Sequence, residues 1–181
     1  MKRSKVFFAV VCCLLFAKQI TAQQFSPADE GSAIQFSIKN FGFTAKGSFA
    51  GLSGKIVYTA DDPLHATFDV HILAKSINTG NNTRDRHLRE DDYFDVEHFP
   101  QISIKSENIT ATKQNGAYIL HGILTIKGTS RKIDIPFTVK PEGSGFIFEG
   151  SITINRLDYK IGSSSISLAD NATVYLKVFA K

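Results

Sequence analysis

The chain has no tryptophan, and its only two cysteines, Cys12 and Cys13, lie within the first 22 of its 181 residues. Beyond residue 22 there is therefore no thiol, which excludes a disulfide framework, a cysteine nucleophile and a cysteine metal centre. An excess of one charge is lacking too. Four of the 21 Lys and Arg residues fall in the same N-terminal stretch, and the remaining 17 balance 17 Asp and Glu. The balanced charge gives no sign of nucleic-acid binding.

The first 22 residues have the pattern of an export signal. A basic segment at 2–5 precedes an apolar run at 6–17, which is too short to cross a bilayer, and Ile20-Thr21-Ala22 offers a cleavage site. We predict a secretory signal peptide at residues 1–22, so that the mature protein is periplasmic or secreted from a bacterium. Cys12 follows Val11 and not a small residue, so we predict no lipid anchor and no stable attachment to the membrane.

Residues 23–181 are long enough to bury a substantial core as one domain. They contain no Gly/Ser/Pro-rich linker, no repeat and no low-complexity tract. A single domain over 23–181 is therefore predicted.

Apolar and polar residues alternate along this domain with the period of two that is typical of strands with one buried face. Turn residues such as Asn115-Gly116 and Lys127-Gly128-Thr129-Ser130 separate the runs, where hairpins are expected to close. The pattern predicts an all-β, antiparallel barrel of about eight strands, and favours it over a two-layer sandwich. Four glycines between residues 42 and 54 suggest bulges that bend the sheet.

The apolar faces of these runs supply the candidates for lining the barrel lumen. We predict that the lumen is lined by Ile34, Phe36, Ile38, Phe43, Phe49, Phe68, Val70, Ile72, Ile102, Ile104, Leu120, Leu124, Phe137, Phe148, Ile152, Ile154 and Leu176. Alternation alone does not distinguish a hollow barrel from a solidly packed one. A packed barrel with an interaction role only is therefore an alternative.

A dense block of charge between Arg84 and Glu97 interrupts the strands. It predicts one short helix near residues 82–92, with Asn82 as the N-cap and Asp85 in the capping-box position. On that helix Arg84, His87 and Asp91 share a face. A small exported hydrolase or isomerase with His87 as general base is the enzymatic alternative. The sequence shows no nucleophile elbow, and its five histidines are scattered without metal-ligand spacing.

Several motifs in order carry a family resemblance: SINTGNNTRDRHL from Ser76, DYFDVEHFP from Asp92, GILTIKG from Gly122 and TINRLDYKIG from Thr153. Together they resemble the YceI-like family of exported bacterial polyisoprenoid-binding proteins, over about residues 32–178. The resemblance implies a lipocalin-like barrel that is not an enzyme.

The ligand that the resemblance implies is a polyisoprenoid, an isoprenoid quinone or a similar long-chain amphiphile, bound in the lumen with no covalent cofactor and no metal. Burial of such a tail contributes on the order of 0.8 kcal/mol per CH₂ group. Arg84, Asp85, His87 and Arg156 stand at motif positions and are the polar candidates for the barrel mouth. Two histidines frequent in the family are absent, since Gly31 and Asn40 stand there. A homodimer of such barrels is also an expectation.

Overall fold

The computed structural model describes residues 23–181, so the predicted signal peptide lies outside the described residues. Ten antiparallel strands form one sheet. The strands are β1 (Gln23–Phe25), β2 (Pro27–Asn40), β3 (Phe43–Phe49), β4 (Ser53–Tyr58), β5 (Thr67–Leu73), β6 (Gln101–Ala111), β7 (Ala117–Ile126), β8 (Thr129–Glu142), β9 (Gly145–Asn155) and β10 (Leu168–Ala180). The helical segments are η1 (Pro63–His65), η2 (Ala74–Ser76), α1 (Asn82–Arg89) and η3 (Arg156–Tyr159).

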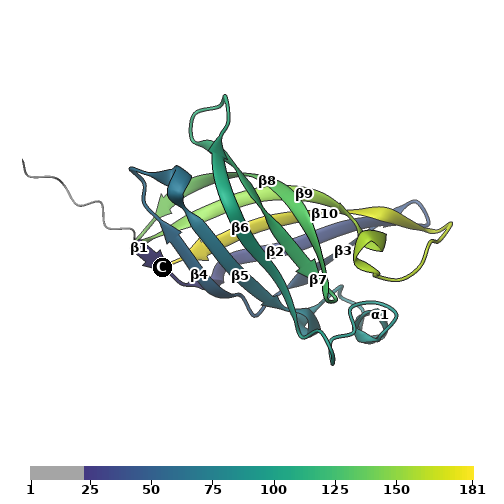
Figure 1. The fold of residues 1–181 in the computed structure, drawn as a ribbon. Helices are drawn as coiled ribbons and strands as arrows, with labels where there is room; N and C mark the ends of the chain where they lie inside the picture. Colours follow the sequence, from purple (N-terminus) through teal and green to yellow (C-terminus); the bar gives the residue numbers. More distant parts are fainter. Residues whose placement is uncertain (1–22) are drawn as a thin grey trace, which may run out of the picture.

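The sheet curls until its two ends approach each other (Figure 1). Strands β4 to β10 are neighbours in sequence order, and β2 and then β3 follow β10. Only Ser26 separates β1 from β2, and this nearly continuous segment pairs with β4 through β1 and with β10 through β2. At the free edge of β3, Ser48 and Asn78 exchange two backbone hydrogen bonds of 2.9 and 3.0 Å. These contacts give the sheet its barrel-like form.

The predicted all-β, antiparallel, lipocalin-like architecture is confirmed, but the strand count is ten and not eight. Two apolar runs, Phe146/Phe148 and Ile152/Ile154, belong to the single strand β9. Three strands, β1, β3 and β4, were not predicted individually. They are short, and glycines interrupt the apolar alternation of β3 and β4.

Tight turns join several of the strands. Lys127-Gly128, between β7 and β8, has positive φ at both residues (47° and 66°), as a two-residue primed hairpin turn requires. Phe41-Gly42, between β2 and β3, has the same form, with φ of 49° and 78°. Gly42 therefore makes a hairpin and not the predicted bulge, and the β2–β3 register runs unbroken from Ile34 opposite Phe49 to Asn40 opposite Phe43.

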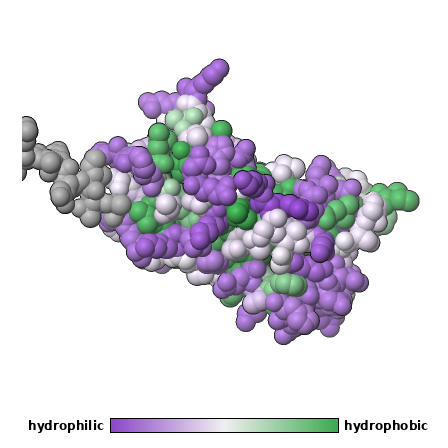
Figure 2. Space-filling model, in the orientation of Figure 1, coloured by the Kyte–Doolittle hydropathy of each residue, from purple (hydrophilic) through white to green (hydrophobic). Residues whose placement is uncertain are grey.

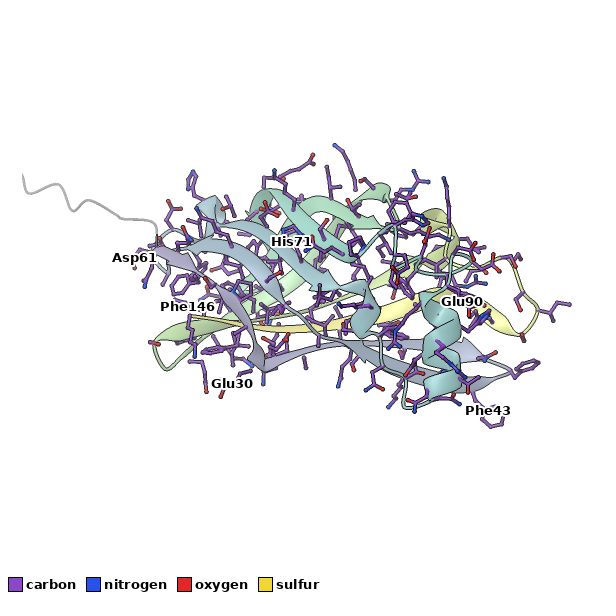
Figure 3. All side chains as sticks on the ribbon, turned by 90° about the horizontal axis from the view of Figure 1, so that it is seen from below. Glu30, Phe43, Asp61, His71, Glu90 and Phe146 are labelled. Atoms are coloured by element: carbon purple, nitrogen blue, oxygen red, sulfur yellow. The ribbon has the colours of Figure 1, made fainter. Side chains whose placement is uncertain are left out.

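One end of the barrel is filled by aromatic rings. Phe68 and Phe148 pack edge to face with their ring centroids 5.2 Å apart, and Tyr58 packs on Phe146 at 4.8 Å. Phe25, at 2% exposed, completes this cluster with an edge contact to Phe146. The chain termini of the described part lie at this end (Figure 1), and Phe146 marks it in Figure 3. These rings close the barrel here.

Helix α1 lies at the opposite end (Figure 1). Its N-cap is Asn81, one residue before the predicted cap, and the Asn81 side chain accepts hydrogen bonds from the backbone N–H groups of Thr83 and Arg84. The helix ends at Arg89, three residues earlier than predicted, so Asp91 lies beyond it. Within residues 23–181 no helix has the length and apolar character needed to span a bilayer.

Candidate functional site

An apolar cavity of about 340 Å³ lies inside the barrel, between the sheet and α1. A second cavity of about 100 Å³ lies deeper. The two adjoin, because they share the lining residues Ile34, Ile72, Ile102, Ile104, Ile135 and Leu176. The barrel interior is therefore hollow on the α1 side of these six residues and is not solidly packed.

The deeper cavity ends against aromatic rings. Phe68, Phe137 and Phe148 line it, and their rings contact one another with centroids 5.2 to 6.5 Å apart. Behind them lies the cluster of Phe25, Tyr58 and Phe146. We call these two adjoining cavities together the tunnel: α1 and the strand ends at Asn40 and Leu168 line its outer end, the mouth, and the aromatic rings close it toward the chain termini.

Sixteen of the 17 predicted lumen residues line one or both cavities. The exception is Phe43, which is 80% exposed. Phe43 lies on the same face of β3 as Ala45 and Phe49, and both of these residues line the larger cavity. Phe43 pairs with Asn40 at the end of the hairpin. The hairpin extends past the mouth there, so no opposite wall covers the ring.

Other lining residues were absent from the prediction. They are Leu52, Ile56, Ile77, Leu88, Tyr93, Phe94, Ile126, Ile135, Ile161, Leu168, Ala172, Val174 and Val178, with Asn40, Ala45, Lys46, His71, Thr79, Glu149 and Gly150. The alternation that identified Phe137 also identifies Ile135. Tyr93 and Phe94 follow α1 in an irregular segment, where no period assigns a side chain to the interior.

Two of the predicted polar residues lie at the mouth. Arg84 lines the larger cavity, and it donates from Nε to Thr79 Oγ1 at 2.7 Å and from Nη2 to the Thr79 carbonyl at 2.8 Å. His87 also lines the cavity, with Nδ1 2.9 Å from Glu90 Oε2 and its ring packed on Tyr93. The Nη1 atom of Arg84 makes no hydrogen bond within residues 23–181. A fixed guanidinium thus borders a predominantly apolar cavity.

Asp85 lies behind the mouth instead of lining it. Its side chain is buried and accepts hydrogen bonds from the backbone N–H of Thr79 at 2.9 Å and from Thr79 Oγ1. Asp85 is therefore a positioning group: it fixes Thr79, and Thr79 in turn holds Arg84. The capping-box role predicted for Asp85 is wrong, because its carboxylate accepts from Thr79 and not from the backbone at the helix start.

Arg156 is 4% exposed, and its guanidinium is occupied by the protein itself. It donates to the carbonyl oxygens of Ile161 (2.8 Å), Ala169 (3.0 Å) and Leu168 (3.4 Å), and to Asp170 Oδ1 at 3.2 Å. These bonds join the end of β9 to the start of β10. Although Arg156 borders the cavity, it stabilises this corner of the barrel and has little donor capacity left for a ligand.

The YceI-like domain matches this chain over residues 25–180. The chain belongs to the YceI-like family. A curated relative, a UPF0312 protein of Pseudomonas fluorescens, is 27% identical over 172 residues, which cover 88% of this chain and 87% of that protein. The YceI protein of Campylobacter jejuni is 28% identical, with a TM-score of 0.67 over 75% of this chain and 83% of that one.

Two more distant structures share the fold of this YceI-like chain. BcnA of Burkholderia cenocepacia has a TM-score of 0.80 at 21% identity, covering 86% of this chain and 99% of that one. A polyisoprenoid-binding domain from Saccharophagus degradans has a TM-score of 0.70 at 15% identity, covering 89% and 99%. The lipocalin-like fold expected from the sequence is thus found in solved YceI structures.

In this YceI-like chain the proposed catalytic face of α1 does not form. Asp91 lies beyond Arg89, the last helical residue. The His87 side chain is 54% exposed and bonds to the exposed Glu90. Among residues 23–181 no three His, Asp or Glu side chains gather as a metal site. Of the three residues of that predicted face, Arg84 and His87 line the larger cavity and Asp91 does not.

The Asp85 carboxylate makes the stability of this end of the YceI-like barrel depend on pH. The hydrogen bond from the Thr79 hydroxyl, aided by the Thr79 N–H and nearby Arg89, holds the pKa of Asp85 below its usual 3.8. A carboxyl with a lowered folded-state pKa contributes stability above pH 3.8 that is lost as the pH falls through the folded-state pKa.

We therefore expect the free energy of unfolding of Asp85→Asn to depend less on pH in the acid range than that of the wild type. The measurement is urea unfolding of the wild type and the variant at a series of pH values from 7 to 2.5. The wild-type free energy of unfolding should fall more steeply than that of the variant below about pH 4. Parallel curves would contradict the role assigned to Asp85. Asp91→Asn, in the exposed segment after α1, is the control.

Proposed function

We propose that this protein is a non-enzymatic binding or carrier protein that holds a polyisoprenoid, an isoprenoid quinone or a similar long-chain amphiphile in its barrel. The observation that carries the proposal is the blind apolar tunnel with polar groups at its open end. Such a site fits a molecule with one apolar tail and one polar head, bound without a covalent bond. The Saccharophagus domain of the same fold, described as polyisoprenoid-binding, adds support.

The energetics favour the tail as the main source of affinity. Burial of apolar surface contributes roughly 0.8 kcal/mol per CH₂ group, and the tunnel lining is almost wholly aliphatic and aromatic. The walls are preformed by paired strands, so little ordering is required when the ligand enters. Arg84 would then orient the head group instead of providing most of the binding energy.

A binding role also fits the chemistry of the mouth better than a hydrolase or isomerase does. His87 is half exposed and its Nδ1 contacts Glu90, an arrangement common on protein surfaces. We propose that the protein works outside the cytoplasm, in the periplasm, because residues 1–22 have the basic and apolar segments of an export signal.

The proposal is tested by titrating the purified protein with a polyprenyl phosphate and with the matching polyprenol. Binding is followed by calorimetry or by intrinsic tyrosine fluorescence, since the chain has no tryptophan. Both ligands should bind, because they share the tail. Arg84→Met should weaken binding of the phosphate at least tenfold and leave binding of the alcohol unchanged, since a charge-assisted hydrogen bond contributes about 1.5–3 kcal/mol.

Arg86→Met is the matched control, because Arg86 is an exposed arginine on the same helix and does not line the cavity. Arg84→Lys should restore part of the phosphate affinity by keeping the charge. Failure of the wild-type protein to bind either ligand would overturn the carrier proposal. An equal loss of affinity for both ligands in Arg84→Met would contradict the proposed role of Arg84 in binding the head group.

A further inference from the structure

An exposed apolar cluster projects from the open end of the barrel. Phe41 and Phe43, in the β2–β3 hairpin, are 75% and 80% exposed, and Ile166, in the segment before β10, is fully exposed. A backbone hydrogen bond of 2.8 Å from Phe41 N to Ser167 O joins the two segments. These three side chains are called the apolar tip below. Figure 2 shows hydrophobic surface at the extreme right of the molecule, where the two segments project in Figure 1.

The apolar tip borders the tunnel opening. Asn40 and Leu168, which pair across β2 and β10, both line the larger cavity, and each adjoins a tip segment in sequence. Phe43 marks this end in Figure 3, far from Phe146 and Asp61 at the closed end. A surface that binds the tip would therefore lie against the mouth.

The segments that carry the tip are cationic. Between Gly31 and Ala50 the charged residues are Lys39 and Lys46, with no Asp or Glu, and between Lys160 and Ala169 the one charged residue is Lys160. The nearest carboxylate along the chain, Asp170, is bonded to Arg156. The other carboxylates of this end include Glu90, Asp91 and Asp92, in the segment after α1, and Asp158, in η3. Within its own two segments the tip thus combines exposed aromatic and aliphatic side chains with lysines.

We propose that the apolar tip docks this protein reversibly on the surface of an anionic lipid bilayer. Exposed aromatic and aliphatic side chains partition into the interfacial region, and lysines beside them are attracted to anionic head groups. Docking places the tunnel mouth against the bilayer, so that a lipid tail enters the barrel without crossing water. This last consequence rests on the proposed carrier function, whereas the docking itself does not.

The test is flotation of the purified protein with vesicles of phosphatidylcholine alone and with one third phosphatidylglycerol, at low and high salt. The wild type should bind the anionic vesicles, and high salt should weaken that binding. Phe41→Asn with Phe43→Thr should weaken it at least tenfold. Asn is chosen because it tolerates the positive φ of residue 41, and Thr because it suits a strand. Lys39→Gln should weaken it about fivefold on anionic vesicles alone.

Leu64→Ser is the matched control: Leu64 is a 45% exposed apolar residue in η1, near Asp61 at the closed end. Equal vesicle binding by the wild type and the tip variant would overturn the proposal, as would an equal loss in Leu64→Ser. A dimer in solution that the tip variant dissociates, without vesicle binding by the wild type, would assign the tip to self-association and also overturn it.

Lipid binding in the tunnel is measured separately from vesicle binding. The tip variant, loaded with polyprenyl phosphate from detergent, should retain wild-type affinity while its uptake of the same lipid from vesicles slows. If neither protein binds the lipid but the wild type still floats with anionic vesicles, the carrier function fails and the docking stands. If both bind the lipid and neither floats, the docking fails alone.

Discussion

Replacement of Ala172 by Phe should reduce at least tenfold the long-chain lipid that the carrier proposal expects to copurify with this protein. Ala172, on β10, is nearly buried, lies between Ile38 and Ile154 on the neighbouring strands, and lines the larger cavity. A phenyl ring at this position enters the space that the tail requires. Because the space is already vacant, the ring should be accepted without the strain of overpacking, and the unfolding midpoint should stay level or rise.

The measurement is organic extraction of the protein purified from its native host, followed by mass spectrometry. Thr173→Phe is the control, because the next residue of β10 faces outward, with its hydroxyl 3.4 Å from that of exposed Thr153. Thr173→Phe should keep the lipid. Wild-type lipid content in Ala172→Phe would show that the cavity is not the binding site.

Replacement of Arg156 by Met should destabilise the fold by about 3–5 kcal/mol, the cost typical of removing one partner from a buried charged network. The carbonyl oxygens of Ile161, Ala169 and Leu168 would lose their donor while they remain near the cavity wall. For a domain of this size the midpoint of thermal unfolding should fall by roughly 10 °C or more.

Arg156→Lys should also be destabilised, since a single ammonium group does not reproduce the fork that contacts three carbonyls. Arg86→Met, at an exposed arginine of α1, should change the midpoint by no more than a degree or two. A midpoint of Arg156→Met equal to that of Arg86→Met would contradict the corner role. Calorimetry or circular dichroism measures all three variants.

The family, the strand-rich fold and the inward residues were predictable from local pattern. Period-two alternation assigns each side chain to a face, and the residues it assigned to the interior include Phe36, Ile104 and Leu176, which line the larger cavity. Turn chemistry located the hairpin at Lys127-Gly128, because positive φ at both turn residues favours glycine there. Such features depend on neighbours in sequence and need no knowledge of the distant chain.

The predictions that failed depend on contacts that no local period specifies. The partner of Asp85 is Thr79, six residues before it, and not the backbone at the helix start. Phe43 lies on the same face of β3 as the lumen residues, but no opposite wall covers its ring, because the β2–β3 hairpin extends beyond the other strands. Arg156 stands in the same motif set as Arg84, yet its donors are taken by backbone carbonyls, whereas Arg84 faces the tunnel.

Whether the interior is hollow was decided only by how the ten strands come together. Alternation specifies which way a side chain points, but the distance across a barrel depends on strand number, tilt and curl. Rings from β5, β8 and β9 meet and fill the closed end. Toward α1 the isoleucines and leucines of facing strands do not reach one another, and the space of about 340 Å³ between them is the site on which the proposed function depends.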